Sequence, residues 1–275
     1  MAIHAGAPLG AVIAALPLEP LESRILLCHA TGLSRVQLIT RADQPLTQEQ
    51  ATHLNALVQR RLAGEPIAYL VGRREFFGLD FAVSEAVLIP RPDTELLVEL
   101  AIERLPPQGR MLDMGTGSGA IAVSVAHSRR DAAVTALDLS EAALEVARGN
   151  AASNQAGVRF LRSDWFGVLD ANESFELIAS NPPYIAAGDQ HLSQGDLRFE
   201  PSGALTDHAD GLSALRTIIE GSPRHLVRGG WLLLEHGYDQ AAAVCALLDA
   251  GGYVEVQSWR DLGGIERVSG GRIPG

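Results

Sequence analysis

The stretch "RMLDMGTGSGAIAV", residues 110–123, decides the fold of this protein. An apolar run is followed by three alternate glycines and then by a second apolar run, a pattern typical of strand, tight turn and helix. Gly115, Gly117 and Gly119 allow the backbone to turn sharply and to approach a ligand closely. The helix that follows presents unpaired backbone N–H groups at its start. The stretch therefore predicts a strand–loop–helix unit with a ligand at the loop.

Outward from this unit, residues 91–275 alternate between strand-like and helix-like segments. Such alternation is typical of an α/β fold with a doubly wound sheet and helices on both faces. A short break separates the last two strand runs, so we expect the sheet to end in an antiparallel hairpin. The predicted strands are residues 110–114, 133–138, 158–161, 175–180, 230–236, 253–259 and 265–269.

The first part of the chain has a different pattern, with no strand-like alternation. In "LESRILLCHATG" the residues Leu21, Ile25 and Cys28 form one apolar helical stripe, and in the next helix Thr47 and Gln50 have capping-box spacing. We therefore expect three parts: a helical domain at 1–73, a β-hairpin connector at 74–90 with aromatic and β-branched residues, and the main domain at 91–275.

Composition narrows the possible functions. The chain has 275 residues, 47% of them apolar, and a formal net charge of −11, which argues against a broad surface for nucleic acid. Cys28 and Cys245 lie far apart and predict free thiols in a reducing compartment, and the histidines show no metal-ligand spacing, so no metal is predicted. The N-terminal run lacks a positive start, and no apolar run approaches the ~20 residues of a membrane span. We expect a cytoplasmic protein.

Asp113 distinguishes between two ligands for the glycine loop. Gly115, Gly117 and Ala120 fit a dinucleotide fingerprint, but a carboxylate two residues earlier would repel a pyrophosphate. It would attract an ammonium group, such as that of the amino-acid end of S-adenosylmethionine. We include Thr116 and Ser118, between the glycines, among the cofactor-binding candidates. The alternative is a tight turn without a ligand.

Acidic residues also follow the next two strands. Asp138 ends the second strand, 19 residues after Gly119, where a carboxylate can accept hydrogen bonds from both ribose hydroxyls. Its alternative role is the N-cap of the next helix. Asp164 is a candidate acceptor for an adenine amino group, and Trp165 is either a neighbour of the adenine ring or a core aromatic.

The tetrapeptide "NPPY", residues 181–184, directly follows the apolar run 175–180. Asn181 and Pro182 each precede a proline and are therefore pushed to extended backbone, while Pro183 stiffens the turn. The Asn181 side-chain oxygen and the Pro182 carbonyl can each accept one N–H of a planar amino group, and Tyr184 can stack on its carrier. Positioning and electrostatics then suffice for in-line methyl transfer. The alternative is a proline turn that ends a strand.

Two further segments are open in their role. "IPRPDTELLVEL" has acidic residues, including Glu95, that suit a helix start, and it could also cover the ligand. "GDLRFEP", residues 195–201, is expected to be a loop beside the site, held by an Arg198–Glu200 or similar ion pair.

Together these motifs resemble the bacterial protein glutamine methyltransferases of the HemK/PrmC type, and the resemblance spans nearly the whole chain. It rests on "GEPIAYLVGRREFFGL" (64–79), "LIPRPDTE" (88–95), "LDMGTGSGAIA" (112–122), "SDWF" (163–166), "SNPPYI" (180–185), "GDLRFEP" (195–201) and "LLLEHG" (232–237). Met114 stands where this family usually has leucine, a conservative packing change.

The resemblance implies a Rossmann-like class I S-adenosylmethionine-dependent methyltransferase with a small N-terminal helical domain. It implies methylation of the glutamine in the Gly-Gly-Gln motif of peptide-chain release factors, with the helical domain recognising the protein substrate. The cofactor would contact Gly115–Gly119, Asp138, Trp165 and Asn181, and the segment Asn181–Tyr184 would hold the glutamine.

Other functions share some of these features. Glutamine methyltransferases of a large-subunit ribosomal protein share NPPY but resemble "VPRSP" instead of "IPRPDTE". Adenine-N6 methyltransferases also share NPPY, but a nucleic-acid substrate requires a basic groove, and this chain has no lysine. A nicotinamide-dependent oxidoreductase would explain the glycines but not Asn181–Tyr184, and a binding module would explain only the fold.

Overall fold

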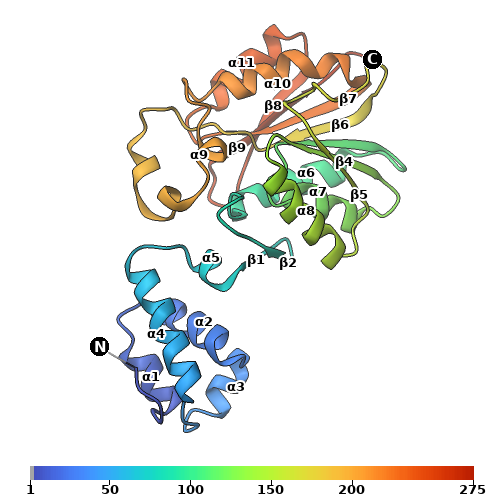
Figure 1. Ribbon diagram of the computed structural model, residues 1–275. Helices are drawn as coiled ribbons and strands as arrows, with labels where there is room; N and C mark the ends of the chain where they lie inside the picture. The colour runs from blue at the N-terminus through green and yellow to red at the C-terminus, as the bar shows by residue number, and fades with distance from the viewer. Residues whose placement is uncertain (1–2) are drawn as a thin grey trace. The chain divides into compact units, whose positions relative to one another are not determined.

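The computed structural model describes residues 3–275, in two compact units, Met1–Gly72 and Arg73–Gly275 (Figure 1). Within residues 3–72 the regular elements are all helices, and the second unit contains both sheets. The division lies one residue before the predicted end of the helical domain. In the part of the chain that the structure describes, no helix is long and apolar enough to cross a membrane.

The helical unit is built around leucines. In α4 the predicted capping box is confirmed, because the Thr47 side chain accepts from the Gln50 N–H and the Gln50 side chain accepts from the Thr47 N–H. The predicted stripe of α2 is wrong: Leu21 is 57% exposed, and the buried face contains Leu26 and Leu27. Four consecutive apolar residues allow several stripes, and packing against α4 selects one. The helices are α1 (Leu9–Ala15), α2 (Pro20–Thr31), α3 (Arg35–Thr40), α4 (Gln48–Leu62) and α5 (Ile67–Val71).

An antiparallel hairpin of β1 (Arg73–Phe76) and β2 (Leu79–Ala82) is present where the connector was predicted, and it begins one residue before the predicted start at 74. Phe76 and Phe81 are fully buried in the core of the larger unit. The Asn150 side chain also holds the hairpin, because it accepts from the Ala82 N–H at 2.7 Å and donates to the Ala82 carbonyl at 3.0 Å. The hairpin is thus an integral part of the larger unit.

The main sheet has seven strands in the order β5-β4-β3-β6-β7-β9-β8. All seven predicted strand runs are confirmed, with shifted ends in some. The first five strands in this order are parallel, and β9 is antiparallel to both its neighbours. The predicted terminal hairpin is therefore present, and its second strand lies between β7 and β8. The strands are β3 (Arg110–Met114), β4 (Ala133–Asp138), β5 (Val158–Arg162), β6 (Phe175–Ser180), β7 (Leu226–Glu235), β8 (Val254–Arg260) and β9 (Glu266–Arg272).

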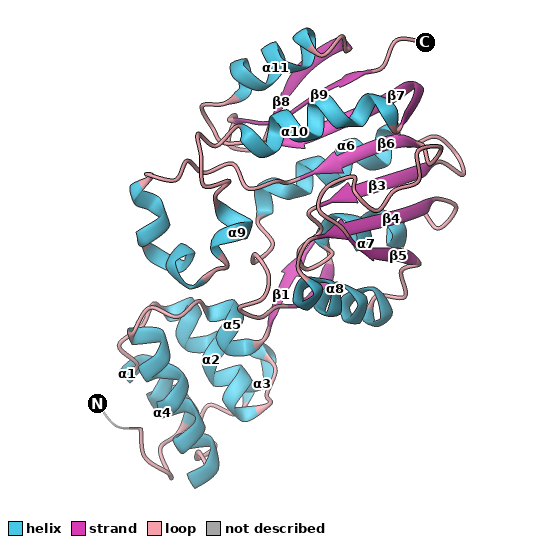
Figure 2. Cartoon of the chain, turned by 45° about the horizontal axis from the view of Figure 1, so that its top comes forward, coloured by secondary structure: helices cyan, strands magenta, loops and turns pink. Residues whose placement is uncertain are grey.

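Helices cover both faces of this sheet, as Figure 2 shows. One apolar core joins the sheet to α6 and α7, and a second core, on the other face, joins it to α10 and α11. The expected doubly wound α/β architecture is thus confirmed. The main helices of this unit are α6 (Glu95–Arg104), α7 (Ala120–Ser128), α8 (Glu141–Ser153), α10 (Ser213–Gly221) and α11 (Ala241–Ala250).

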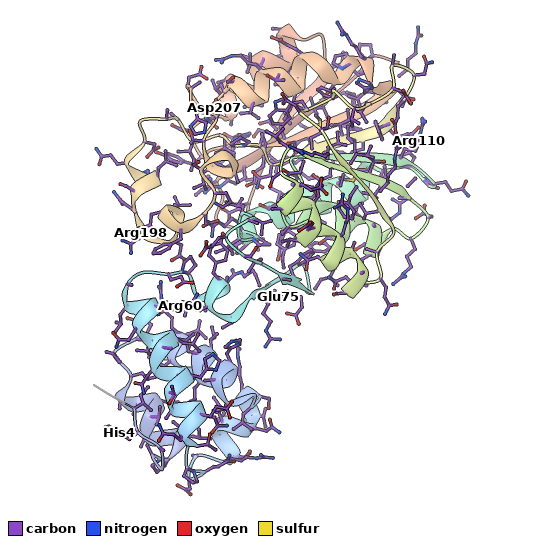
Figure 3. All side chains as sticks on the ribbon, viewed as in Figure 1. His4, Arg60, Glu75, Arg110, Arg198 and Asp207 are labelled. Carbon is purple, nitrogen blue, oxygen red and sulfur yellow. The ribbon has the colours of Figure 1, made fainter. Side chains whose placement is uncertain are left out.

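The strand order reverses at β3, because β4 lies on one side of it and β6 on the other. In such sheets ligands bind outside the carboxyl ends of the strands at the reversal point. At that end the Ser180 hydroxyl donates to the Met114 carbonyl at 2.6 Å and ties β6 to β3. The opposite end is marked by Arg110, labelled in Figure 3, whose guanidinium pairs with Glu176 at 2.9 Å.

Candidate active site

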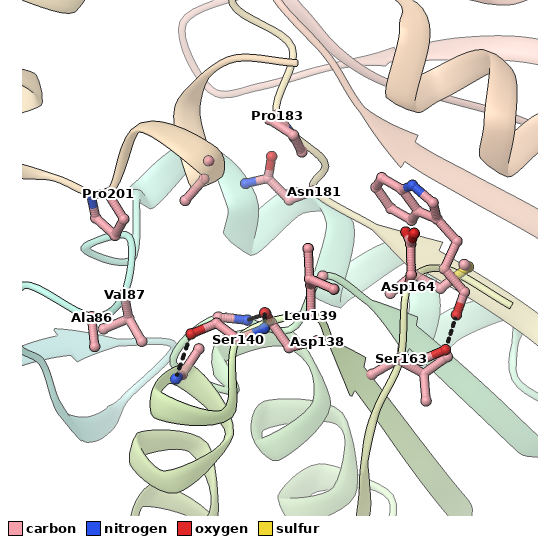
Figure 4. A pocket seen from close by; sticks show the side chains of 18 residues that line it. Ala86, Val87, Asp138, Leu139, Ser140, Ser163, Asp164, Asn181, Pro183 and Pro201 are labelled. Carbon is pink, nitrogen blue, oxygen red and sulfur yellow. Dashed lines mark hydrogen bonds between the residues drawn. The ribbon is translucent and has the colours of Figure 1, made fainter. Parts of the chain in front are cut away.

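A cavity of about 310 Å³ lies at the carboxyl ends of β3, β4, β5 and β6. Figure 4 shows Asn181 and Pro183 on one side of it and Asp138 and Ser140 on the other. Its volume lies within the range of roughly 300–1,000 Å³ that is common for small-molecule sites. The predicted residues that line it are Gly115, Gly117, Asp138, Asp164, Trp165, Asn181 and Pro183.

The glycine loop forms the floor of this cavity. Gly115 and Gly117 have φ values of +72° and +55°, and a Cβ on either would meet no atom within 4 Å. The left-handed backbone therefore explains why both positions are glycine, and the open space beside them is part of the cavity. Gly119 differs, because a Cβ there would lie 3.1 Å from the Cβ of Ala147 in α8.

Asp113 lies beneath the loop and does not line the cavity. Its Oδ2 accepts from the Thr116 hydroxyl at 2.6 Å and from the Ala122 N–H at 3.1 Å, so this oxygen ties the loop to the start of α7. Oδ1 is buried and has no partner among the described residues. Burial raises the pKa of Asp113 to about 7. A buried carboxylate oxygen without a donor is a site at which a nearby positive charge would be stabilised.

Thr116 and Ser118 are also buried and lie outside the cavity lining. The Thr116 hydroxyl is used by Asp113, and the Ser118 carbonyl accepts from the Asn150 side chain at 2.8 Å. Both residues thus stabilise the loop from behind.

Asp138 reaches the cavity from the end of β4. Its Oδ2 accepts from the Gly117 N–H at 2.8 Å, and its Oδ1 accepts from the Ser140 N–H at 2.9 Å. Burial raises the pKa of Asp138, and these hydrogen bonds partly offset that effect. Each oxygen retains a second lone pair for a ligand. The N-cap of α8 is Ser140, whose hydroxyl accepts from the Ala143 N–H, so the alternative N-cap role for Asp138 is wrong.

Asp164 and Trp165 line the cavity after β5. Trp165 has a φ of +45°, which is rare for a bulky residue, and the Ser163 hydroxyl holds its carbonyl at 2.7 Å. The indole also packs against the second apolar core, which lies between the main sheet and helices α10 and α11. Trp165 is therefore both a core aromatic and a wall of the cavity.

Asn181 is held by a residue that the sequence did not point to. Its Nδ2 donates to the Thr94 hydroxyl oxygen at 3.2 Å, which leaves Oδ1 as the acceptor available in the cavity. Thr94 ends the short helix η1 (Pro92–Thr94) and is 4% exposed. The segment that could have covered the ligand thus supplies a partner for the Asn181 amide.

Pro182 and Tyr184 line a second, smaller cavity of about 60 Å³, together with Arg91 and Leu197. The Tyr184 hydroxyl donates to Oε1 of Glu235 at 3.3 Å, and the Gln240 side chain donates to the Tyr184 carbonyl at 3.0 Å. Burial raises the pKa of the Tyr184 phenol above its ordinary value. The tetrapeptide therefore has its first residue in the larger cavity and its last in the smaller one.

Glu235 is a second polar residue beside the site that the sequence analysis did not single out. It is 1% exposed at the end of β7, and burial raises its pKa to about 7. A signal was present, because Glu235 is a carboxylate that ends an apolar run at the carboxyl end of a central strand.

The two segments whose roles the sequence left undecided, "IPRPDTELLVEL" and "GDLRFEP", meet beside the site. The Glu200 carboxylate accepts a hydrogen bond from the Ile89 N–H at 3.0 Å and forms an ion pair with Arg91. An ion pair of Glu200 was expected, with Arg198 or a similar residue, and Arg91 comes from the segment 88–95 instead of from the loop 195–201. Next to this pair, Pro201 lines the larger cavity. Glu95 has a structural role, because its Oε1 accepts from the Phe77 N–H at 3.0 Å in the hairpin turn.

The remaining cavity wall is mostly apolar, which local sequence patterns do not reveal. Met114, the residue that departs from the family pattern, is part of this wall. The residues not predicted are Ala86, Val87, Met114, Leu137, Leu139, Ser140, Ala143, Ser163, Pro201, Gly203 and Ala204.

Comparisons with known proteins agree with this geometry. Residues 12–72 match the model of the PrmC N-terminal domain, and residues 92–198 match that of the methyltransferase small domain. The chain is 57% identical over 272 residues to a release factor glutamine methyltransferase of Burkholderia pseudomallei, covering 96% of this chain and 95% of the relative. It is 48% identical over 253 residues to the protein of that name from Escherichia coli, covering 91% of each.

A solved methyltransferase structure from Pyrococcus furiosus matches 78% of this chain and 97% of its own, with a TM-score of 0.55 and 22% identity. That similarity concerns the fold, which is the methyltransferase fold. The match to the curated relatives covers more than nine tenths of the chain and therefore extends over both units. The chain belongs to the family of release factor glutamine methyltransferases.

Proposed function

We propose that this protein transfers a methyl group from S-adenosylmethionine to the side-chain amide nitrogen of the glutamine in the Gly-Gly-Gln motif of peptide-chain release factors. The observation that carries the proposal is the orientation of Asn181, whose amide nitrogen is engaged by Thr94 and whose oxygen is left for a donor in the cavity. The name of the curated relatives supports the release factor as substrate.

The residues present fit the cofactor. The carboxylate of Asp138 retains acceptor capacity for two neighbouring ribose hydroxyls, and Gly115 and Gly117 leave open space against the backbone. Asp164 and Trp165 offer an acceptor and a flat wall for the adenine end. The buried Oδ1 of Asp113 has no hydrogen-bond partner among the described residues, and an ammonium group bound near the loop would favour the ionised form of this carboxyl group.

The chemistry assigned to Asn181 and Pro182 follows from the nature of an amide nitrogen. Its lone pair is delocalised into the carbonyl, so it is a weak nucleophile. When it attacks the methyl carbon, a nitrogen–carbon bond forms as the carbon–sulfur bond breaks, and the nitrogen later loses one proton. Positive charge develops on its N–H groups during this step, and two fixed acceptors, the Asn181 Oδ1 and the Pro182 carbonyl, would stabilise that charge.

The test is transfer of a radiolabelled methyl group to three substrates side by side: a release factor, a large-subunit ribosomal protein and adenine-containing DNA. We expect the release factor to be labelled, with the label on the glutamine amide by mass spectrometry. Preferential labelling of the ribosomal protein would show that this enzyme is a ribosomal-protein glutamine methyltransferase instead. Preferential labelling of DNA would contradict a protein substrate.

A further inference from the structure

Tyr184 is held at both ends by groups at the end of β7 and directly before α11. The Gln240 side chain donates to the Tyr184 carbonyl at 3.0 Å, and the Tyr184 hydroxyl donates to Glu235 Oε1 at 3.3 Å. This segment is itself fixed to β9, because the His236 N–H donates to the Arg267 carbonyl at 2.9 Å. A residue of the proposed acceptor site is therefore held by two side chains that line neither of the two cavities.

The Gln240 amide has only one orientation that satisfies its neighbours. Its Oε1 accepts from the Gly237 N–H at 2.8 Å, and its Nε2 donates to the carbonyls of Tyr184 at 3.0 Å and Gly211 at 3.2 Å. A flipped amide would set an oxygen against two carbonyl oxygens and an NH₂ group against an N–H donor. The NH₂ group of Gln240 thus joins the Tyr184 backbone to the loop that contains Gly211.

Gly211 is packed against the same carbonyl group. It has a φ of +79°, and a Cβ at this position would lie 2.5 Å from the Tyr184 carbonyl oxygen. Only glycine combines this close approach with a left-handed backbone. Asp207, labelled in Figure 3, fixes this loop, because its carboxylate accepts from the N–H groups of Gly211 at 3.0 Å and Ser213 at 2.8 Å. We call Gly211 and Gln240 the Tyr184 clamp.

The sequence of the acceptor segment explains why a contact from outside the segment is needed. Pro182 and Pro183 have no N–H group, so this part of the chain cannot be held by N–H donors of its own. After the prolines, the Ile185 N–H donates to the Leu205 carbonyl at 3.0 Å. Between these points the clamp contacts the Tyr184 carbonyl, and it thereby fixes the backbone that carries the Tyr184 ring.

We propose that Gln240 is a positioning residue for the methyl acceptor: together with Gly211 it fixes the Tyr184 backbone, and through it the ring that contacts the target glutamine. This inference rests on the proposed function, which gives Tyr184 its role in substrate binding, and adds to it the residues that determine where Tyr184 lies. Gln240 lines neither cavity, so its effect on the substrate passes through Tyr184.

The main test variant is Gln240→Glu, which keeps the length of the side chain and the acceptor for Gly237 but loses the NH₂ donor. A carboxylate oxygen would then face the carbonyl oxygens of Tyr184 and Gly211, and these groups would repel each other. In steady-state assays with a release factor we expect KM to rise roughly 10-fold, as for the loss of one or two hydrogen bonds, while kcat stays near normal. The Kd for S-adenosylmethionine, measured by calorimetry, should stay unchanged. The matched control is Gln257→Glu, the same change at an exposed position of β8, which should leave KM unchanged.

A second variant, Gly211→Ala, acts on the same carbonyl group by steric contact. The new methyl group would force the Tyr184 carbonyl away, so KM for the release factor should rise while the Kd for S-adenosylmethionine stays unchanged. The matched control is Gly149→Ala in α8, because a Cβ there would meet no atom within 4 Å. This control should leave KM unchanged, and an unchanged KM for Gly211→Ala would contradict the clamp.

A double-mutant cycle tests whether Gln240 acts through the Tyr184 ring. In a Tyr184→Ala background, Gln240→Glu should add little to KM, because the ring that Gln240 positions is already absent. A general loss of stability would instead leave the effect of Gln240→Glu the same in both backgrounds.

The results separate this inference from the proposed function. Labelling of a release factor by the unmodified protein tests the function alone, and a different protein substrate would be used in the same KM comparison. Near-normal KM for Gln240→Glu would overturn the positioning role, and so would a full further rise in KM in the Tyr184→Ala background. If Gln240→Glu fails to fold, Gln240→Met, which has a similar length and no donor, provides the same comparison of KM.

Discussion

Replacing Asp138 with alanine should weaken the binding of S-adenosylmethionine by roughly ten- to a hundredfold. Each carboxylate oxygen already accepts one backbone N–H, from Gly117 or from Ser140, and keeps one further acceptor position. A hydrogen bond to a charged group contributes roughly 1.5–3 kcal/mol, and each 1.4 kcal/mol is about tenfold in affinity. Loss of the Gly117 contact would also loosen the loop, which places the expected change toward the upper end.

Calorimetric titration of the full-length protein with S-adenosylmethionine measures this change directly. The matched control is Asp131→Asn, which lies before the start of β4 at the opposite end of the sheet and should leave the affinity unchanged. If Asp138→Ala bound the cofactor as tightly as the unmodified protein, Asp138 would not belong to the site. Tight binding of NAD by the unmodified protein would refute the cofactor assignment as a whole.

Three further predictions concern catalysis, pH and the protein substrate. Asn181→Ala should lower kcat while the affinity for the cofactor stays largely intact, and near-normal turnover of this variant in steady-state assays would refute the two-acceptor mechanism. Tyr184→Ala should mainly raise KM for the release factor. Asp113 has a pKa raised from 3.8 to about 7 in the folded state, so the folded protein binds its proton more tightly than the unfolded chain and this contribution to stability is lost as pH rises from about 4 to 7. At about 1.4 kcal/mol per pKa unit, that loss is at most about 4 kcal/mol. Urea titrations at several pH values should show that the free energy of unfolding falls more steeply with pH for the unmodified protein than for Asp113→Asn. Parallel pH profiles of the two proteins would contradict this prediction. A folded release factor should be methylated with far higher kcat/KM than a short Gly-Gly-Gln peptide, because a second contact on the helical unit would raise effective concentration; equal kcat/KM values for the two would argue against that second contact.

Much of the fold was determined by local sequence. The apolar runs of the sheet and the glycines at 115, 117 and 119 depend on backbone preferences and on burial of both sheet faces, which are visible over a few residues. Asp138 and Asn181 were predicted for the same reason, since the end of a parallel strand always reaches the same edge of the sheet.

Only the tertiary structure decided which distant groups meet at that edge. Asn181 contacts Thr94 across 87 residues, and Ile89 contacts Glu200 across 111, distances at which no sequence period carries information. The place of β9 between β7 and β8 and the buried face of α2 likewise depend on packing partners. Sequence identified the Asn181 amide as an acceptor, but the partner of its NH₂ group is the Thr94 hydroxyl, which only tertiary contacts bring beside it.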